Sequence, residues 1–203
     1  MDTAVAVVQA YLQINGYFTV CEYPVIESTR KATRSATDLD VLAFRFPGAG
    51  REVRPSRRRR VSGAALFEPD PALGCPADRA DMIVGEVKEG RAHFNPAARD
   101  PLVLGAALAR FGCCPPDHAP EVVRQLLASG HAVTAHGHAV RMVAFGGRGE
   151  PTEYPTYRVV PLGHAIAFLR SYLEDHWGTL HAAQLKLPGL DLLALLHKCE
   201  SGS

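Results

Sequence analysis

The sequence has no long apolar run and no excess of one charge. Among its 203 residues, 22 lysines and arginines nearly balance 21 aspartates and glutamates, which leaves a net charge of +1. The chain as a whole is therefore not a polycation, and nucleic-acid binding would require a local basic patch. Segment 1–17 has no basic start and is interrupted by Gln9, Gln13 and Asn15, so we expect neither a signal peptide nor a membrane span.

Paired cysteines and the common nucleotide-binding or hydrolase motifs are also absent. The five cysteines are odd in number and irregularly spaced, with no CxxC pair. This argues against a secreted disulfide framework and favours a reducing, cytoplasmic location. No P-loop, GxGxxG or GxSxG motif supports other enzyme chemistry on a generic α/β scaffold.

The chain does contain enough apolar residues, 47%, to form the core of one domain, with or without an appendage. Its periodicity predicts a largely buried helix over residues 3–15, which Gly16 ends. Segment 47–81 has little pattern and is expected to be a loop with one short hairpin. The predicted order is α-β-β-β-α-α-β-β-α-α, which indicates an α/β protein with one central mixed sheet flanked by helices. The strands are expected in 17–27, 37–46, 81–90, 131–147 and 154–163, and the later helices in 95–112 (interrupted at Pro101), from 120, in 163–177 and in 189–198.

Charged residues occur at unexpected places in two of these strands. Asp38 and Asp40 precede the apolar run VLAF, and Glu86 and Lys88 follow the run MIV. Because side chains alternate along a strand, Asp38 and Asp40 should share a face, with Leu39 and Val41 opposite. If the two strands are neighbours, Asp40, Glu86 and Lys88 converge beside the core. Burying ionised groups there costs several kcal/mol unless they are paired or bind a metal ion.

Two carboxylates and a backbone carbonyl would form a site of hard oxygen ligands. Such a site suits Mg²⁺ or Mn²⁺ rather than zinc. A lysine beside the ion would hold the attacking water or stabilise developing negative charge. The alternative is a plain ion pair, which is the commonest meaning of Glu-x-Lys taken alone and stabilises little.

The segments INGYFTV, TDLDVLAFR and MIVGEVKEG together resemble the restriction-endonuclease-like superfamily of PD-(D/E)xK nucleases. The resemblance covers residues 1 to about 96. It implies a metal-dependent phosphodiesterase core in which Asp40 and Glu86 bind the metal, the Val87 carbonyl is a further ligand and Lys88 is the catalytic lysine. Leu39 replaces the family's proline. The first helix lacks the glutamate of many members, and Gln9 or Gln13 could substitute; Asp38 is a second accessory candidate.

Segment 51–60, REVRPSRRRR, carries a net charge of +5. Arg57, Arg58, Arg59 and Arg60 either contact phosphates or form a solvated loop. We expect residues 1–96 to form the nuclease-like core and 97–203 to complete the same domain or to form a small extension. DNA is the expected partner, and the leucine-rich last helix is either core or a homodimer contact. The predicted function is Mg²⁺-dependent hydrolysis of DNA; the alternative is an inactive module of the same fold that binds nucleic acid or a protein.

Overall fold

The computed structural model describes residues 2–28, 33–49, 52–53, 65–66, 69–183 and 187–201. The helices are α1 (Thr3–Ile14), α2 (Pro101–Phe111), α3 (Ala119–Ser129), α4 (Leu162–Ala183) and α5 (Pro188–Ser201), with the short 3₁₀ turns η1 (Pro71–Leu73) and η2 (Ala97–Arg99). The strands are β1 (Phe18–Ser28), β2 (Thr33–Arg45), β3 (Glu52–Val53), β4 (Ala65–Leu66), β5 (Asp81–Lys88), β6 (His131–Val133), β7 (Ala139–Gly146), β8 (Thr152–Tyr154) and β9 (Tyr157–Val160).

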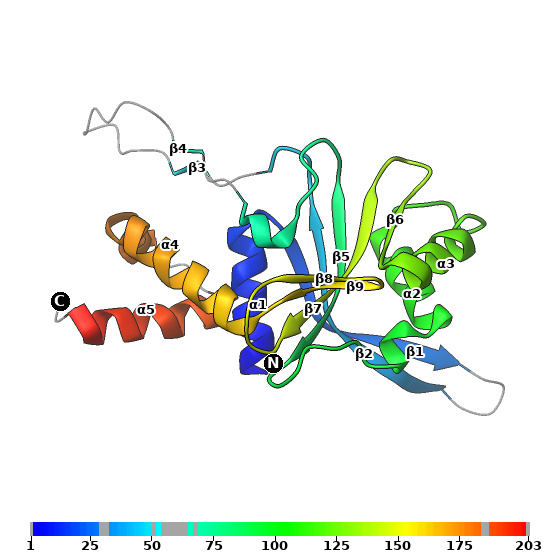
Figure 1. Cartoon of the computed structure of the whole chain (residues 1–203), viewed down its shortest axis with the longest axis horizontal. Helices are drawn as coiled ribbons and strands as arrows, with labels where there is room; N and C mark the ends of the chain where they lie inside the picture. The colour runs from blue at the N-terminus through cyan, green and yellow to red at the C-terminus, as the bar shows by residue number, and fades with distance from the viewer. Residues whose placement is uncertain are drawn as a thin grey trace.

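One mixed sheet of seven strands organises the protein, in the order β1-β2-β5-β7-β9-β8, with β6 also paired to β7. The β1–β2, β2–β5 and β8–β9 pairs are antiparallel, whereas β5–β7 and β7–β9 are parallel. Helices α1, α4 and α5 lie on one side and α2 and α3 on the other (Figure 1). This confirms the predicted α/β class with a central mixed sheet flanked by helices. No helix in the described part of the chain combines the length and apolarity needed to cross a membrane.

Two separate cores hold these layers together. In the first core, Ile83, Val87 and Phe145 pack against helices α1, α4 and α5. In the second, Met82 and Val84 pack against helices α2 and α3. Strand β5 therefore contributes alternate residues to both cores, and all but its last residue are buried. A central strand buried on both faces is the expected environment for an uninterrupted apolar run.

Several local predictions differ from the structure. The helix predicted over 95–112 begins only at Pro101, because Asp100 caps it by accepting from the Leu102 N–H and proline suits the first helical position. The strand predicted over 131–147 is two antiparallel strands joined by a turn at 134–138. The strand predicted over 154–163 is the β8–β9 hairpin, which ends at Val160 before α4. The short hairpin expected within 47–81 is present as the β3–β4 pair.

The second half of the chain completes the sheet that the first half begins. Strand β7 pairs along the whole of β5, from Asp81–Ala139 to Lys88–Gly146. Strands β8 and β9 then extend the same sheet beyond β7. Helices α2 and α3 form the crossover between β5 and β7 and cover one face of the sheet (Figure 1).

A buried ion pair fixes the N-terminal end of β5. Asp81 is fully buried, and Arg141 on β7 donates to both of its carboxylate oxygens, at 2.8 and 2.6 Å. The Tyr17 hydroxyl donates to the same carboxylate, and burial beside Asp81 raises the pKa of Tyr17 well above its usual value. Arg141 also donates to the Leu73 carbonyl at 2.7 Å, which ties η1 to the sheet. Every charge at this end of β5 therefore has a partner within the protein.

Replacing Arg141 should destabilise the protein strongly. Arg141→Met leaves the buried Asp81 carboxylate without its cation, so we expect a loss of about 3–5 kcal/mol in the free energy of unfolding. Arg170→Met is the matched control, because it removes an exposed ion pair with Glu200 and should cost about 1 kcal/mol or less. Urea denaturation measures both. Equal losses would contradict the structural importance of the Asp81–Arg141 pair.

Candidate functional site

Strands β2 and β5 bring the predicted catalytic residues together. The two strands pair antiparallel up to Val41 and Gly85, so Asp40 and Glu86 are the next residue on each strand. Beyond this point the acceptor is a side chain instead of a main-chain carbonyl, because the Val87 N–H donates to Asp40 Oδ2 at 2.7 Å. Asp40 is thus held in place by the main chain of β5.

Glu86 is the buried carboxylate of the site. It lies on the same face of β5 as Met82 and Val84, and only 3% of its surface is exposed. Burial raises the pKa of Glu86 above its usual value, and the neighbouring Asp40 charge raises it further. Lys88 and a hydrogen bond from the Asn95 backbone act in the opposite direction. The ionised form of Glu86 is therefore disfavoured overall, although Lys88 and Asn95 offset part of the cost of burying its charge.

Lys88 lies between the two carboxylates. Its Nζ is 2.5 Å from Glu86 Oε1 and 3.8 Å from Asp40 Oδ2. The Lys88 and Asp40 side chains are about 31% and 25% exposed, so the site opens to solvent on their side while Glu86 forms its floor. Two carboxylates therefore share one ammonium group.

The path of β2 at Asp40 differs from the prediction. Leu39 and Val41 are both fully buried, but Leu39 belongs to the core beneath α2 and α3 and Val41 to the core beneath α1. The prediction that these two residues share a face is wrong. Strand β1 changes face at the same level, where Glu22 has a φ of 51° between the Cys21–Val41 and Tyr23–Leu39 pairs. This irregularity lies next to Val41–Gly85, the last β2–β5 pair. Beyond that pair, the Asp40 carboxylate accepts the hydrogen bond from the Val87 N–H of β5.

Gly85 allows the two strands to approach next to Glu86. A Cβ at this position would lie 2.4 Å from Val41 Cγ1 and 3.3 Å from the Phe145 ring. Any larger residue would push Val41 away and, with it, the adjacent Asp40. The glycine in GEVK is therefore part of the site geometry, although its side chain contributes no chemistry.

The accessory residues lie apart from this cluster. Gln9 is on α1 and donates to the Thr19 hydroxyl at 3.4 Å, as does Gln13 at 2.8 Å. Helix α1 packs in the first core, on the sheet face opposite Glu86. Asp38 is exposed, and its closest described partner is the Ser35 hydroxyl at 3.4 Å.

The predicted arginine cluster lies outside the described residues, at positions 57 to 60. The described chain on either side of it joins the sheet where Arg45 pairs with Asp81. That pair is five positions from Asp40 along β2, or about 17 Å at the usual rise of a strand. The connection between β2 and β5 therefore attaches at the opposite end of β5 from Glu86.

The donor set suits a hard divalent cation. Asp40 and Glu86 provide oxygen ligands on adjacent strands, and Mg²⁺ is commonly held by one or two carboxylates with water completing its shell. The nearby Cys21 thiol is a poor competing ligand, since burial raises its pKa to about 11. Within the described ranges, no group of three or more His, Cys, Asp or Glu side chains could hold a metal ion. A cation here would therefore depend on these two carboxylates and on backbone or water oxygens.

Asn95 lies in the turn after β5, where the sequence predicts a surface turn residue or a substrate contact rather than a partner of Glu86. It contacts Glu86 through its backbone amide, and its side chain caps the following turn by accepting from the Ala97 N–H at 3.0 Å. A main-chain contact leaves no signature in residue type. In the sequence, only the adjacency of GRAHFN to the end of β5 connects this turn with the site.

No family model, no curated protein and no solved structure matches this chain. The resemblance to PD-(D/E)xK nucleases therefore stays a prediction. Because a fold hosts many chemistries, function has to be inferred from the Asp40, Glu86 and Lys88 geometry itself.

Removing the charge of Glu86 should change how stability depends on pH. Since the folded-state pKa of Glu86 is raised, the native state keeps its proton to a higher pH than the unfolded chain does. The stability that this proton contributes is complete below the unfolded value and is lost as pH rises through the folded value. In EDTA, Glu86→Gln should therefore gain melting temperature relative to the native protein as pH rises from about 4.5.

Glu174→Gln serves as the control, because Glu174 is exposed on α4. Its melting temperature should follow that of the native protein across the same pH range. A Glu86→Gln curve parallel to the native curve at every pH would show that Glu86 is not an energetically costly buried carboxylate.

Proposed function

We propose that this protein hydrolyses phosphodiester bonds in DNA with the help of Mg²⁺ or Mn²⁺. The observation that carries the proposal is the sharing of one lysine by two carboxylates, with Lys88 Nζ at 2.5 Å from Glu86 and 3.8 Å from Asp40. Fully ionised, these three groups sum to one negative charge. A proton on Glu86 or a bound cation would balance it.

The residues that would hold the metal are Asp40 and Glu86, with the Val87 carbonyl as the further ligand that the family resemblance implies. Bound there, the ion would neutralise charge on the scissile phosphate and lower the pKa of water. Asp40 is oriented for this role by the Val87 N–H, and Glu86 by the Asn95 backbone. Such hydrogen bonds from the main chain hold a metal ligand in one position, whereas a solvated carboxylate without them can rotate.

Lys88 would act on the reacting groups. Its ammonium group reaches both carboxylates and is partly exposed, so it can donate to an attacking water or to a phosphate oxygen at the mouth of the site. In either position it stabilises the negative charge that develops during displacement at phosphorus. Two fixed carboxylates and one partly exposed ammonium group thus support metal-assisted phosphoryl transfer.

The second candidate is a module of this fold that binds nucleic acid or a protein without catalysis. One observation favours it: the two glutamines of α1 bond Thr19, and no acidic residue stands in the first turn of that helix. A site with fewer acidic ligands binds metal more weakly. Divalent-metal stabilisation separates the two candidates, since a ligand that binds only the native state raises its melting temperature.

Cleavage of a DNA panel tests the main proposal. We expect the native protein to cut at least one of plasmid, linear, single-stranded or branched DNA with Mg²⁺ or Mn²⁺ and to be inactive in EDTA. Lys88→Ala and Asp40→Ala should each lower the cleavage rate by about 10²- to 10⁴-fold, because each removes a group that acts on the transition state.

Lys198→Ala and Asp117→Asn are the charge-matched controls. Lys198 lies near the C-terminal end of α5 and Asp117 is an exposed residue before α3, so both variants should keep native rates. Unchanged cleavage in Lys88→Ala would overturn the mechanism. No cleavage of any substrate and no metal-induced stabilisation would favour the non-catalytic module.

A further inference from the structure

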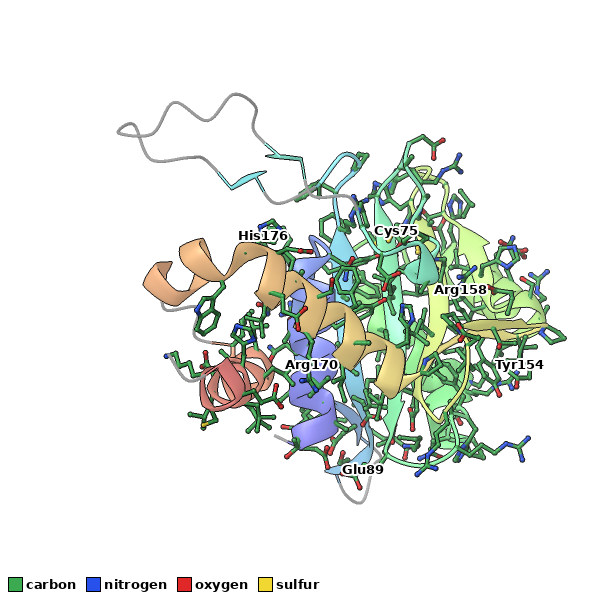
Figure 2. All side chains as sticks on the ribbon, turned by 60° about the vertical axis from the view of Figure 1, so that its left-hand side comes forward. Cys75, Glu89, Tyr154, Arg158, Arg170 and His176 are labelled. Atoms are coloured by element: carbon green, nitrogen blue, oxygen red, sulfur yellow. The ribbon has the colours of Figure 1, made fainter. Side chains whose placement is uncertain are left out.

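A cleft opens directly beside the end of β5. It has a volume of about 460 Å³ and is lined by residues 89–92, 146–148, Tyr154 and Val159. Glu89 follows Lys88 in sequence, so the cleft begins one residue from the proposed catalytic lysine. Figure 2 labels two of these lining residues, Glu89 after β5 and Tyr154 on β8.

Glycines form the floor of the cleft. A Cβ at Gly146 would lie 2.4 Å from the Lys88 carbonyl oxygen, so the ends of β5 and β7 touch through bare backbone. The Gly147 N–H donates to the Gly90 carbonyl at 2.5 Å and closes the floor. Because no side chain projects from these positions, an extended ligand can approach the main chain closely.

Two arginines supply positive charge to the cleft. Arg91 and Arg148 are exposed, and neither guanidinium has an ion-pair partner within the part of the chain that the structure describes. Arg158, close by on β9, is instead paired with Glu153 at 2.7 Å. Unpaired guanidinium groups suit the geometry of phosphates. Glu89 also lines the cleft and would repel the same phosphates.

An exposed tyrosine beside the cleft offers a flat stacking surface. Tyr154 is 46% exposed, and its ring stacks on Tyr157 with centroids 5.3 Å apart and planes inclined by 24°. Tyr157 in turn contacts the buried Phe94 ring at 5.4 Å. Tyr157 and Phe94 therefore fix the position of the Tyr154 ring, which itself remains accessible. Such a ring can stack on a nucleic-acid base, whatever its sequence.

A second cleft, near the other side of the site, has the opposite character. It has a volume of about 630 Å³ and lies between the far end of the β1–β2 hairpin and α2. Glu27 and Asp100 line it, and no lysine or arginine is among its described lining residues. Its described lining therefore offers no basic side chain comparable with Arg91 and Arg148 of the first cleft.

We propose that the cleft formed by residues 89–92, 146–148 and Tyr154 binds a single strand of nucleic acid and leads it to Lys88. Arg91 and Arg148 contact successive phosphates, and an unpaired base stacks on Tyr154. A paired base is stacked within its duplex and is not free to cover this ring, so the substrate would be single-stranded or have a single-stranded segment. The cleavage role of this strand rests on the proposed function; its binding does not.

Fluorescence anisotropy in EDTA tests binding without any cleavage. The probe is a labelled 15-residue oligothymidylate, compared with a duplex of the same length. Tyr154→Ala should weaken single-strand binding by about 5- to 100-fold, and Tyr154→Phe should restore it. Arg91→Ala/Arg148→Ala should reduce the slope of log affinity against log salt by about 1.4, or about 0.7 for each lost phosphate contact. Glu89→Gln should strengthen binding.

Arg124→Ala/Arg170→Ala is the charge-matched control, because these arginines are exposed on helices α3 and α4 and are paired with Glu121 and Glu200. It should leave the slope unchanged. Equal losses in the two double variants, no effect of Tyr154→Ala, or no binding of the oligonucleotide would overturn the proposal. Single-strand binding through these residues in a protein that cleaves nothing would support this inference and reject the nuclease function. Cleavage that is unchanged in the Tyr154 and Arg91/Arg148 variants would support the nuclease function and reject this inference.

Discussion

The burial of charge along β5 is the constraint on which the rest of the structure depends. This central strand is covered on both faces, yet it begins with Asp81 and ends with Glu86 and Lys88. A buried carboxylate is tolerated only where cations and hydrogen-bond donors surround it. A cation is present at both ends: Arg141 on the neighbouring strand β7 faces Asp81, and Lys88 on β5 itself faces Glu86. The pairing of β7 beside β5 is therefore both a packing and an electrostatic requirement.

The two ends of β5 solve this problem differently. At Asp81 one carboxylate meets one guanidinium and one hydroxyl, and the group is closed off from solvent. At Glu86 a second carboxylate, Asp40, joins the pair, and the site remains partly open. The first arrangement stabilises the fold. The second groups two carboxylates around one ammonium group where solvent and ligands can reach them, which is the pattern expected of a functional site.

The sequence predicts the parts of this account that depend on periodicity and residue type. The apolar runs and turn residues indicated the mixed α/β class, and alternation in MIVGEVK placed Glu86 and Lys88 together on one face. The alternation of side chains failed to predict β2 at Asp40, because β1 and β2 both change face there. This change accompanies the positive φ of Glu22 on β1, which the residue pattern around Asp40 does not reveal. The hydrogen bonds of Asn95 and Gly147 could not be predicted from residue type either, since both are made by main-chain atoms. The Asp81–Arg141 pair joins residues sixty positions apart, and nothing local predicts it.

Calorimetric titration with Mn²⁺ tests the central claim most directly, because it asks whether a cation balances the charge of Asp40 and Glu86. The account predicts one ion per chain in the native protein and none at this site in Asp40→Asn. It also predicts proton release on binding that increases as pH falls toward the range in which Glu86 holds its proton. Binding that is absent, or equal in Asp40→Asn, would contradict the account.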